Sequence, residues 1–273
     1  MKNMIKKEHI FDVCPRKRPA AARVVAAVCM AALLASLGGC ATWPLSESDG
    51  SDLLLQKAVE RLFSTPMGKH ALWEPFFFPG KRHADFEPVL MQGRPALRVQ
   101  ARSSVSILRH RLEPALAAPG SLSFSWRVNG LPRNADLAVP SRADAAVRVV
   151  LAFDGDRAQW NARTHRLSEM SRLLTGEELP HATLIYVWSA GSAPGTVLSH
   201  ARTDRIRKLV LDSGTAHVGQ WRDHVRDVRA DFRHAFGEEP GPLRSLALMT
   251  DTDNTESELT AWYGALTLEQ ATD

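Results

Sequence analysis

The sequence is poor in cysteine: its 273 residues include only Cys14, Cys29 and Cys40. A secreted domain that is stabilised by disulfide bonds needs paired cysteines in its folded part. None follows Cys40, so the fold must rest on the burial of apolar side chains, which a chain of this length can supply. The same count excludes cysteine nucleophiles and thiolate metal sites from residues 41–273.

Long apolar runs are also absent. The most apolar stretch, Val24 to Leu37, is too short to cross a bilayer as a helix, which needs ~20 residues. It follows a basic segment and ends at Leu37-Gly38-Gly39-Cys40, a pattern typical of bacterial lipoprotein signal peptides. We predict that residues 1–39 are a signal peptide and that Cys40 carries acyl chains such as palmitate, which anchor the protein to a membrane. An uncleaved signal anchor is the alternative.

A basic excess is missing once this segment is set aside. The chain has a formal net charge of +4, but residues 1–39 hold seven Lys/Arg and two Asp/Glu, which leaves 27 Lys/Arg and 28 Asp/Glu in residues 40–273. Nucleic-acid-binding domains are usually basic, so we expect no nucleic-acid partner. Ala41 stands where an aspartate commonly signals retention at the inner membrane. The expected location is therefore the cell envelope, at the outer membrane facing the periplasm.

Several catalytic motifs are absent as well. The sequence contains no G-x-S-x-G turn, no glycine-rich nucleotide loop and no pair of histidines at short metal-ligand spacing. These absences favour a role other than catalysis without deciding the question.

What is present is a series of short β-type runs. Residues 40–62 are predicted to form a tether and a short helix, and residues 63–273 one domain. Its many short strands predict a mainly β fold, an antiparallel β-sandwich of jelly-roll type with one or two peripheral helices. The candidate strands are Leu72–Phe77, Ala96–Ala101, Val105–Leu112, Ser121–Val128, Ala145–Phe153, Thr183–Trp188, Ile206–Leu211, Ser245–Thr250 and Trp262–Leu268.

Trp221 to Phe236 is predicted to form a helix, because Val225, Val228 and Phe232 recur with helical spacing. A stripe of arginines lies beside this apolar face in the same projection. It indicates either an ordinary solvated surface or a site for an anion such as a lipid phosphate or an acidic glycan.

A series of short motifs stands out from Ala145 onward: Ala145-Ala146-Val147-Arg148-Val149, Phe153-Asp154-Gly155-Asp156, Gly176–Trp188, Gly195-Thr196-Val197, Arg202-Thr203, Trp221-Arg222, Leu248–Thr255 and Tyr263-Gly264. Through these motifs the sequence resembles the bacterial domain of unknown function 3047 family, over roughly residues 70–268. The resemblance implies a secreted or lipid-anchored bacterial protein and brings no catalytic residues, because the family carries no established activity. The strand layout is also similar to that of jelly-roll glycan-binding modules.

Asp251, Asp253 and Asn254 are the predicted ligand contacts, with Trp188 or Trp262 as stacking partners. The three polar residues follow a predicted strand, and in extended chain both carboxylates would face one side about 7 Å apart. They could bind Ca²⁺, which we expect as the one candidate cofactor, or hydrogen-bond sugar hydroxyls. The alternative is a turn in which these side chains bond their own backbone.

Other acidic residues keep an enzymatic alternative open. Asp154 and Asp156 flank a glycine, and Glu177 and Glu178 precede a predicted strand. A hydrolase acting on glycans would need two carboxyl groups facing one cleft, one of them with a raised pKa.

We therefore expect a lipid-anchored envelope protein that binds a glycan or another anionic component without catalysis. A glycan hydrolase and a structural lipoprotein that docks an envelope protein are the alternatives. Asp251→Ala is expected to abolish ligand or Ca²⁺ binding and to leave folding largely intact.

Overall fold

The computed structural model describes residues 50–66, 73–158 and 160–271. All of them belong to one compact unit, residues 46–273. The predicted signal peptide, the acylation of Cys40 and the tether as far as residue 49 lie outside the described residues and stay predictions. Within the described ranges, no helix has both the length and the apolar character needed to span a membrane.

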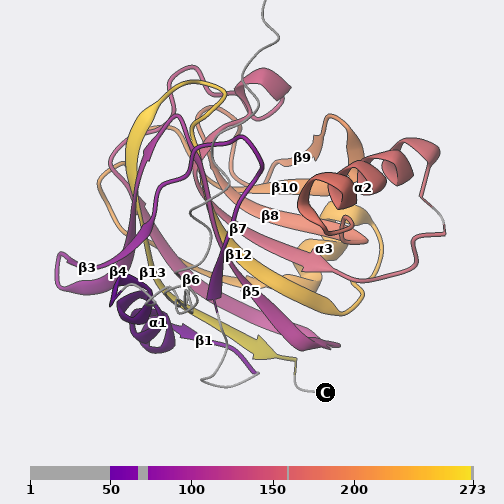
Figure 1. The fold of residues 1–273 in the computed structure, drawn as a ribbon, viewed down its shortest axis with the longest axis horizontal. Coiled ribbons are helices and arrows are strands. Elements are labelled where there is room, and N and C mark those ends of the chain that lie inside the picture. The colour runs from indigo at the N-terminus through magenta and orange to yellow at the C-terminus, as the bar shows by residue number, and fades with distance from the viewer. Residues whose placement is uncertain (1–49, 67–72, 159, 272–273) are drawn as a thin grey trace, which may run out of the picture. The chain divides into compact units, whose positions relative to one another are not determined.

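The described residues form two β-sheets that pack face to face (Figure 1). The six-stranded sheet has the order β11-β6-β13-β4-β3, with β1 paired to β13. The seven-stranded sheet has the order β2-β5-β12-β7-β8-β10-β9. The strands of the six-stranded sheet are β1 (Phe63–Ser64), β3 (Phe86–Met91), β4 (Arg94–Arg102), β6 (Pro119–Val128), β11 (Arg222–Asp227) and β13 (Glu258–Gln270). Those of the seven-stranded sheet are β2 (Trp73–Phe76), β5 (Val105–Leu116), β7 (Ala145–Phe153), β8 (Ala182–Ser189), β9 (Val197–His200), β10 (Thr203–Ser213) and β12 (Leu243–Asp251).

The predicted β-sandwich is confirmed, and each candidate strand overlaps an observed strand. Strand pairing departs from the prediction at two places among the described strands, because β8–β10 and β1–β13 are parallel. After β8 the chain forms the β9–β10 hairpin, and β10 rather than β9 pairs with β8. The sheets are therefore mixed rather than wholly antiparallel.

One hydrophobic core fills the space between the sheets. Because side chains alternate along a strand, every second residue of each sheet points inward. The seven-stranded sheet contributes Leu108, Leu151 and Tyr186, and the six-stranded sheet contributes Val99 and Trp126. Intervening residues of the seven-stranded sheet point to its outer face, which carries the candidate site.

Three α-helices lie within the described ranges: α1 (Gly50–Leu62), α2 (Ala162–Thr175) and α3 (Val228–Phe236). The first confirms the predicted short helix. The second was not predicted, because the residues it buries against the sheet are Thr164 and Ser168, which give no apolar period. Its ends are nevertheless well defined: the Asn161 side chain caps the start, and Gly176 ends the helix in the left-handed conformation.

The predicted helix over Trp221 to Phe236 is wrong in its first half. Arg222–Asp227 is strand β11, antiparallel to β6, and only the part from Val228 is helical. The Asp227 side chain accepts a hydrogen bond from the Ala230 amide at 2.9 Å and so sets the start of α3. The arginine stripe is thereby divided. Its members pair with carboxylates: Arg222 with Asp212, Arg226 with Asp231, and Arg229 and Arg233 with Glu239.

Candidate functional site

The outer face of the seven-stranded sheet has a covered half and an open half. Over the covered half lies the segment 129–144, whose Leu137 packs on Val187 and Val210. Beside it, under helix α2, the face is hollowed. The outward side chains of β12 cross both halves: Ser245, Ala247 and Met249 lie in the hollow, and Asp251 lies at the covered end.

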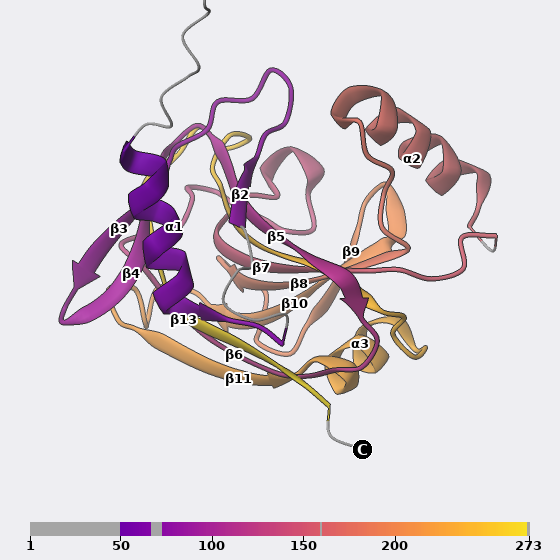
Figure 2. The same cartoon turned by 60° about the horizontal axis from the view of Figure 1, so that its bottom comes forward.

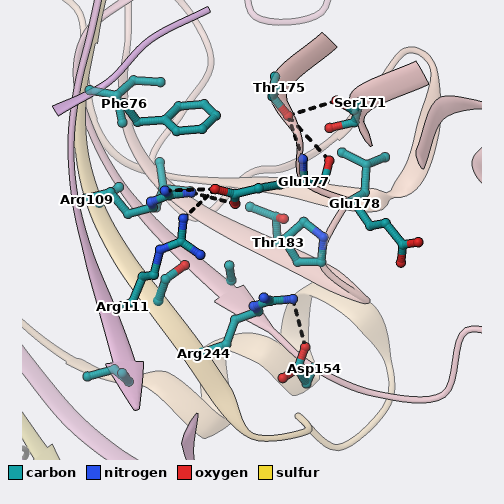
Figure 3. Close-up of a pocket in the computed structure, with 18 of the residues that line it drawn as sticks. Phe76, Arg109, Arg111, Asp154, Ser171, Thr175, Glu177, Glu178, Thr183 and Arg244 are labelled. Carbon is teal, nitrogen blue, oxygen red and sulfur yellow. Dashed lines mark hydrogen bonds and ion pairs between the residues drawn. The ribbon is translucent and has the colours of Figure 1, made fainter. Parts of the chain in front are cut away.

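The hollow, which we call the outer-face cleft, has a volume of about 440 Å³. Phe76 lies on the β2 side, and Ser171 and Thr175 of α2 lie on the other (Figure 3). Phe78, in the loop that follows β2, also lines the cleft. The floor is apolar, as is usual for small-molecule sites. It is formed by Ile107, Val150, Ile185, Ala247 and Met249.

One part of the outer-face cleft is lined by Arg109, Arg111 and Glu177. Glu74, which is not among the lining residues, pairs with both arginines and completes a charge network. The guanidinium group of Arg109 donates to both carboxylate oxygens of Glu177, at 2.8 and 3.0 Å, and to Glu74 at 2.8 Å. Arg111 donates from Nε to Glu74 at 3.1 Å and also contacts Glu177 (Figure 3). The Arg109 guanidinium lies 4.5 Å from the centre of the Phe76 ring, so the ring helps to hold it in place.

The arginines keep both glutamates ionised. Partial burial raises the pKa of Glu177, but the hydrogen bonds and charges of Arg109 and Arg111 outweigh it and hold the pKa below its ordinary value. The hydrogen bond from Arg109 is the largest cause of the lowered pKa of Glu74.

Two further ion pairs involve residues that line the outer-face cleft. Arg244 contacts Asp154 at 3.2 Å, and Arg157 contacts Glu178 at 2.7 Å. The acidic residues Asp154, Glu177 and Glu178, which the sequence singled out as carboxylates, therefore do reach one cleft. Each is paired with an arginine there.

The predicted contacts Asp251, Asp253 and Asn254 are close together but lie at the covered end of the sheet. Carboxylate oxygens of Asp144, Asp251 and Asp253 lie within 4.8 Å of one another. These groups already have partners: Arg148 donates to Asp251 at 2.7 Å, and Lys81 contacts Asp253. A Ca²⁺ ion would compete with these cations, and the calcium prediction stays untested.

Asp144 holds the turn that follows β12. Its Oδ1 accepts from the Asn254 side chain at 2.8 Å, and its Oδ2 accepts from the Thr255 amide at 2.8 Å and the Thr255 hydroxyl at 2.6 Å. The Asn254 side chain thus bonds to the carboxylate of Asp144, on a distant segment, and not to its own backbone. The role of Asn254 as a ligand contact stays a prediction.

Four charged residues, each at most 7% exposed, form what we call the buried charge cluster: Asp144, Arg148, Lys208 and Asp251. Burial raises the pKa of Asp251 to about 6, although the charge and hydrogen bond of Arg148 lower it. Burial likewise lowers the pKa of Lys208 to about 8, while its ammonium donates to the Leu137 carbonyl at 3.1 Å.

The two predicted stacking partners do not present open ring faces, and this part of the prediction is wrong. Trp188 is 1% exposed and donates from Nε1 to the Gly214 carbonyl at 3.0 Å. Trp262 is 8% exposed, and the guanidinium of Arg127 lies 5.1 Å from its ring centre. The aromatic side chains at the cleft are Phe76 and Phe78.

Sequence reasoning missed Arg109 and Arg111, although a signal for them exists. Ile107, Arg109 and Arg111 alternate with buried residues along a strand that was predicted, so their side chains must share the outer face. Nothing in the local sequence says that Glu177, 66 and 68 positions away, meets them there.

A family model described as protein of unknown function (DUF3047) matches residues 71–267, most of the chain. No curated protein matches the sequence.

Among solved structures, the xyloglucanase domain of NopAA, a type three effector from Sinorhizobium fredii, is 9% identical with a TM-score of 0.39, covering 74% of this chain and 99% of that one. A family 12 xyloglucanase from Bacillus licheniformis is 5% identical with a TM-score of 0.38, covering 72% and 97%. CBM28, a carbohydrate-binding module specific for non-crystalline cellulose, is 10% identical with a TM-score of 0.33, covering 72% of this chain and 86% of that one. At these identities and TM-scores the likeness carries no functional argument.

Proposed function

The chain belongs to the DUF3047 family, and we propose that it is a lipid-anchored, non-catalytic glycan-binding module of the cell envelope whose ligand lies in the outer-face cleft. The observation that carries this proposal is the cleft itself. It is an open hollow with an apolar floor and a wall of fixed hydrogen-bonding groups.

A sugar ring fits this combination of groups. It has apolar C–H faces that pack on an apolar floor and hydroxyls that both donate and accept hydrogen bonds. Guanidinium groups offer only donors, and ionised carboxylates offer only acceptors. The ion pairs of Glu177 with Arg109 and Arg111 hold both kinds in place at the cleft before a ligand arrives, which lowers the ordering cost of binding.

The state of the carboxylates favours binding over hydrolysis. Glycoside hydrolysis needs one carboxyl group that is protonated near neutral pH. The pKa values of Glu74 and Glu177 are instead lowered, by arginines in direct contact. Glu177, which lines the cleft, therefore suits hydroxyl binding.

The proposed ligand position differs from the one that the sequence suggested. Asp251 is 7% exposed and paired with Arg148, and Asp253 is paired with Lys81. A ligand there would have to displace these cations, whereas the outer-face cleft is open.

Calorimetric titration of the protein with neutral and uronic-acid oligosaccharides tests the proposal. Ser245→Trp places a large ring on the cleft floor, and we expect it to weaken binding at least about tenfold, equivalent to ~1.4 kcal/mol. Val225→Trp, at a residue of β11 that is 73% exposed, is the matched control and should bind like wild type. Equal affinity of Ser245→Trp and wild type would place the ligand elsewhere.

A reducing-sugar assay on the same oligosaccharides separates binding from hydrolysis. We expect no product release; turnover that disappears in Glu177→Gln would replace the proposal by the hydrolase alternative. The anchor has its own test, because mass spectrometry of the mature N-terminal peptide from bacterial membranes should find acyl chains on Cys40.

A further inference from the structure

Large apolar side chains are exposed at a few places only. Nine are exposed among the described residues, and seven of them lie on three segments. Leu53 and Leu54 belong to the first turns of α1, Phe77 and Phe78 to the loop between β2 and β3, and Met170, Leu173 and Leu174 to α2. Their exposed fractions run from 40% for Phe78 to 77% for Leu173.

The three segments point to the same side of the described unit. In Figure 2 the N-terminal end of α1, the loop between β2 and β3, and α2 all reach toward the top of the view. Leu54 and Phe77 also line one shallow pocket together with His83. A flat surface laid against this side would meet all three segments.

Helix α2 is amphipathic, but its polar side faces the sheet and its apolar side faces away from it. It turns small polar residues, Thr164 and Ser168, toward the sheet. At about 100° per residue, Leu173, Met170 and Leu174 fall in one stripe about 100° wide on the opposite side. An apolar stripe that faces away from the core is the feature that needs an explanation.

The charge within this stripe has one sign. Arg163 and Arg166 project among the three apolar residues, while the acidic Glu169 projects outside the stripe. In the loop between β2 and β3, exposed Arg82 and His83 follow the two phenylalanines. Surfaces that lie in the headgroup region of anionic membranes typically combine leucine and phenylalanine side chains with arginine.

We infer that this apolar–basic face, made of Leu53, Leu54, Phe77, Phe78, Arg163, Arg166, Met170, Leu173 and Leu174, rests on an anionic phospholipid bilayer. The position of α1 supports this occupant. The chain allows at most about 35 Å between Cys40 and Gly50, so an acylated Cys40 holds the N-terminal end of α1 close to the membrane. The same end carries Leu53 and Leu54.

Photo-crosslinking of the full-length chain tests the inference. The chain carries p-benzoylphenylalanine in place of Leu174, which is 58% exposed, or in place of Val225 on β11, which is 73% exposed and serves as the control. Each protein is mixed with vesicles of phosphatidylglycerol and phosphatidylethanolamine, or of phosphatidylcholine alone, and lipid adducts are quantified by mass spectrometry. In the anionic vesicles we expect at least about tenfold more adduct at position 174 than at position 225.

A charge-reversal variant of the basic residues tests the electrostatic part of the inference. Arg163→Glu combined with Arg166→Glu should lower the adduct at position 174 about tenfold in anionic vesicles, and phosphatidylcholine should give a similarly low yield. Equal yields at positions 174 and 225, or equal yields in both kinds of vesicle, overturn the inference. Crosslinks from position 174 to a second copy of the chain, or to another protein, also overturn it. Because oligosaccharide binding is measured without vesicles, failure of one proposal is distinguishable from failure of the other.

Discussion

The two halves of the outer face of the seven-stranded sheet contain the same chemistry in different surroundings. In the buried charge cluster, Arg148 contacts Asp251 at 2.7 Å. In the outer-face cleft, Arg109 contacts Glu177 at 2.8 Å. The pKa of Asp251 is nevertheless raised, to about 6, while the pKa of Glu177 is lowered.

The difference comes from burial and from the number of arginines. Asp251 is 7% exposed and has one arginine, so the cost of removing the charge from water dominates. Glu177 keeps about a third of its side chain exposed and has two arginines, so their attraction dominates. A carboxylate beside an arginine is therefore not by itself a sign of a binding site. The covered half stabilises the fold, and the open half is the one available to a ligand.

The largest expected effect is on the covered half. Asp251→Ala leaves the Arg148 guanidinium buried without its carboxylate, and because arginine stays protonated it cannot neutralise itself. We expect a loss of about 3 kcal/mol in the free energy of unfolding, measured by urea denaturation. The sequence-based expectation of intact folding in this variant thus needs revision. Asp251→Asn, which keeps an oxygen for Arg148, is the matched control and should lose much less.

Asp144→Ala should cause the next largest loss in the free energy of unfolding. It removes the acceptor for the Asn254 side chain and for the amide and hydroxyl of Thr255. We expect a loss of about 2 kcal/mol in the free energy of unfolding. Asp136→Ala, whose pair with Arg142 is half-exposed, should lose under about 1 kcal/mol. Similar losses in both variants would contradict the structural role of Asp144.

The pH dependence of stability should differ in sign between the two halves. The pKa of Asp251 rises on folding from 3.8 to about 6, so its contribution to stability is present below pH about 4 and lost as the pH rises through 6. The pKa of Glu177 falls on folding, so its contribution is present above the ordinary value of 4.5 and lost as the pH falls through the lowered pKa. Urea denaturation from about pH 3 to about pH 7 measures the contributions of both carboxyl groups to the free energy of unfolding.

The matched variants isolate each contribution. The free energy of unfolding of Asp251→Asn, relative to wild type, should increase as the pH rises from about 4 to 6. Glu177→Gln should be less stable than wild type at neutral pH, and this difference should disappear as the pH falls below about 4.5. Differences of the same sign would show that burial does not separate the two halves as described.

The smallest effect on stability is expected at the cleft wall. Arg111 is 41% exposed, so Arg111→Ala should change the free energy of unfolding by under about 1 kcal/mol. Its effect on oligosaccharide affinity should be larger than its effect on stability. Arg111→Lys keeps the charge but loses the planar fork, so an intermediate affinity is expected. A variant that loses stability but keeps full affinity would assign Arg111 to the fold.

The sequence by itself determined the fold class, the positions of the predicted strands and the family, because alternation along a strand and local motifs are carried by neighbouring residues. It failed for α2 and for the first half of 221–236. The buried side of α2 is small and polar, and β11 exists because β6 pairs with it.

Only the tertiary structure decided which charged residues are buried. Asp251 and Glu177 both lie near strand ends in the sequence, and nothing local distinguishes them. The segment 129–144 covers the first, and two arginines of β5 meet the second in an open cleft. Burial and charge pairing depend on contacts between distant parts of the chain, so they arise only when the sheet is assembled.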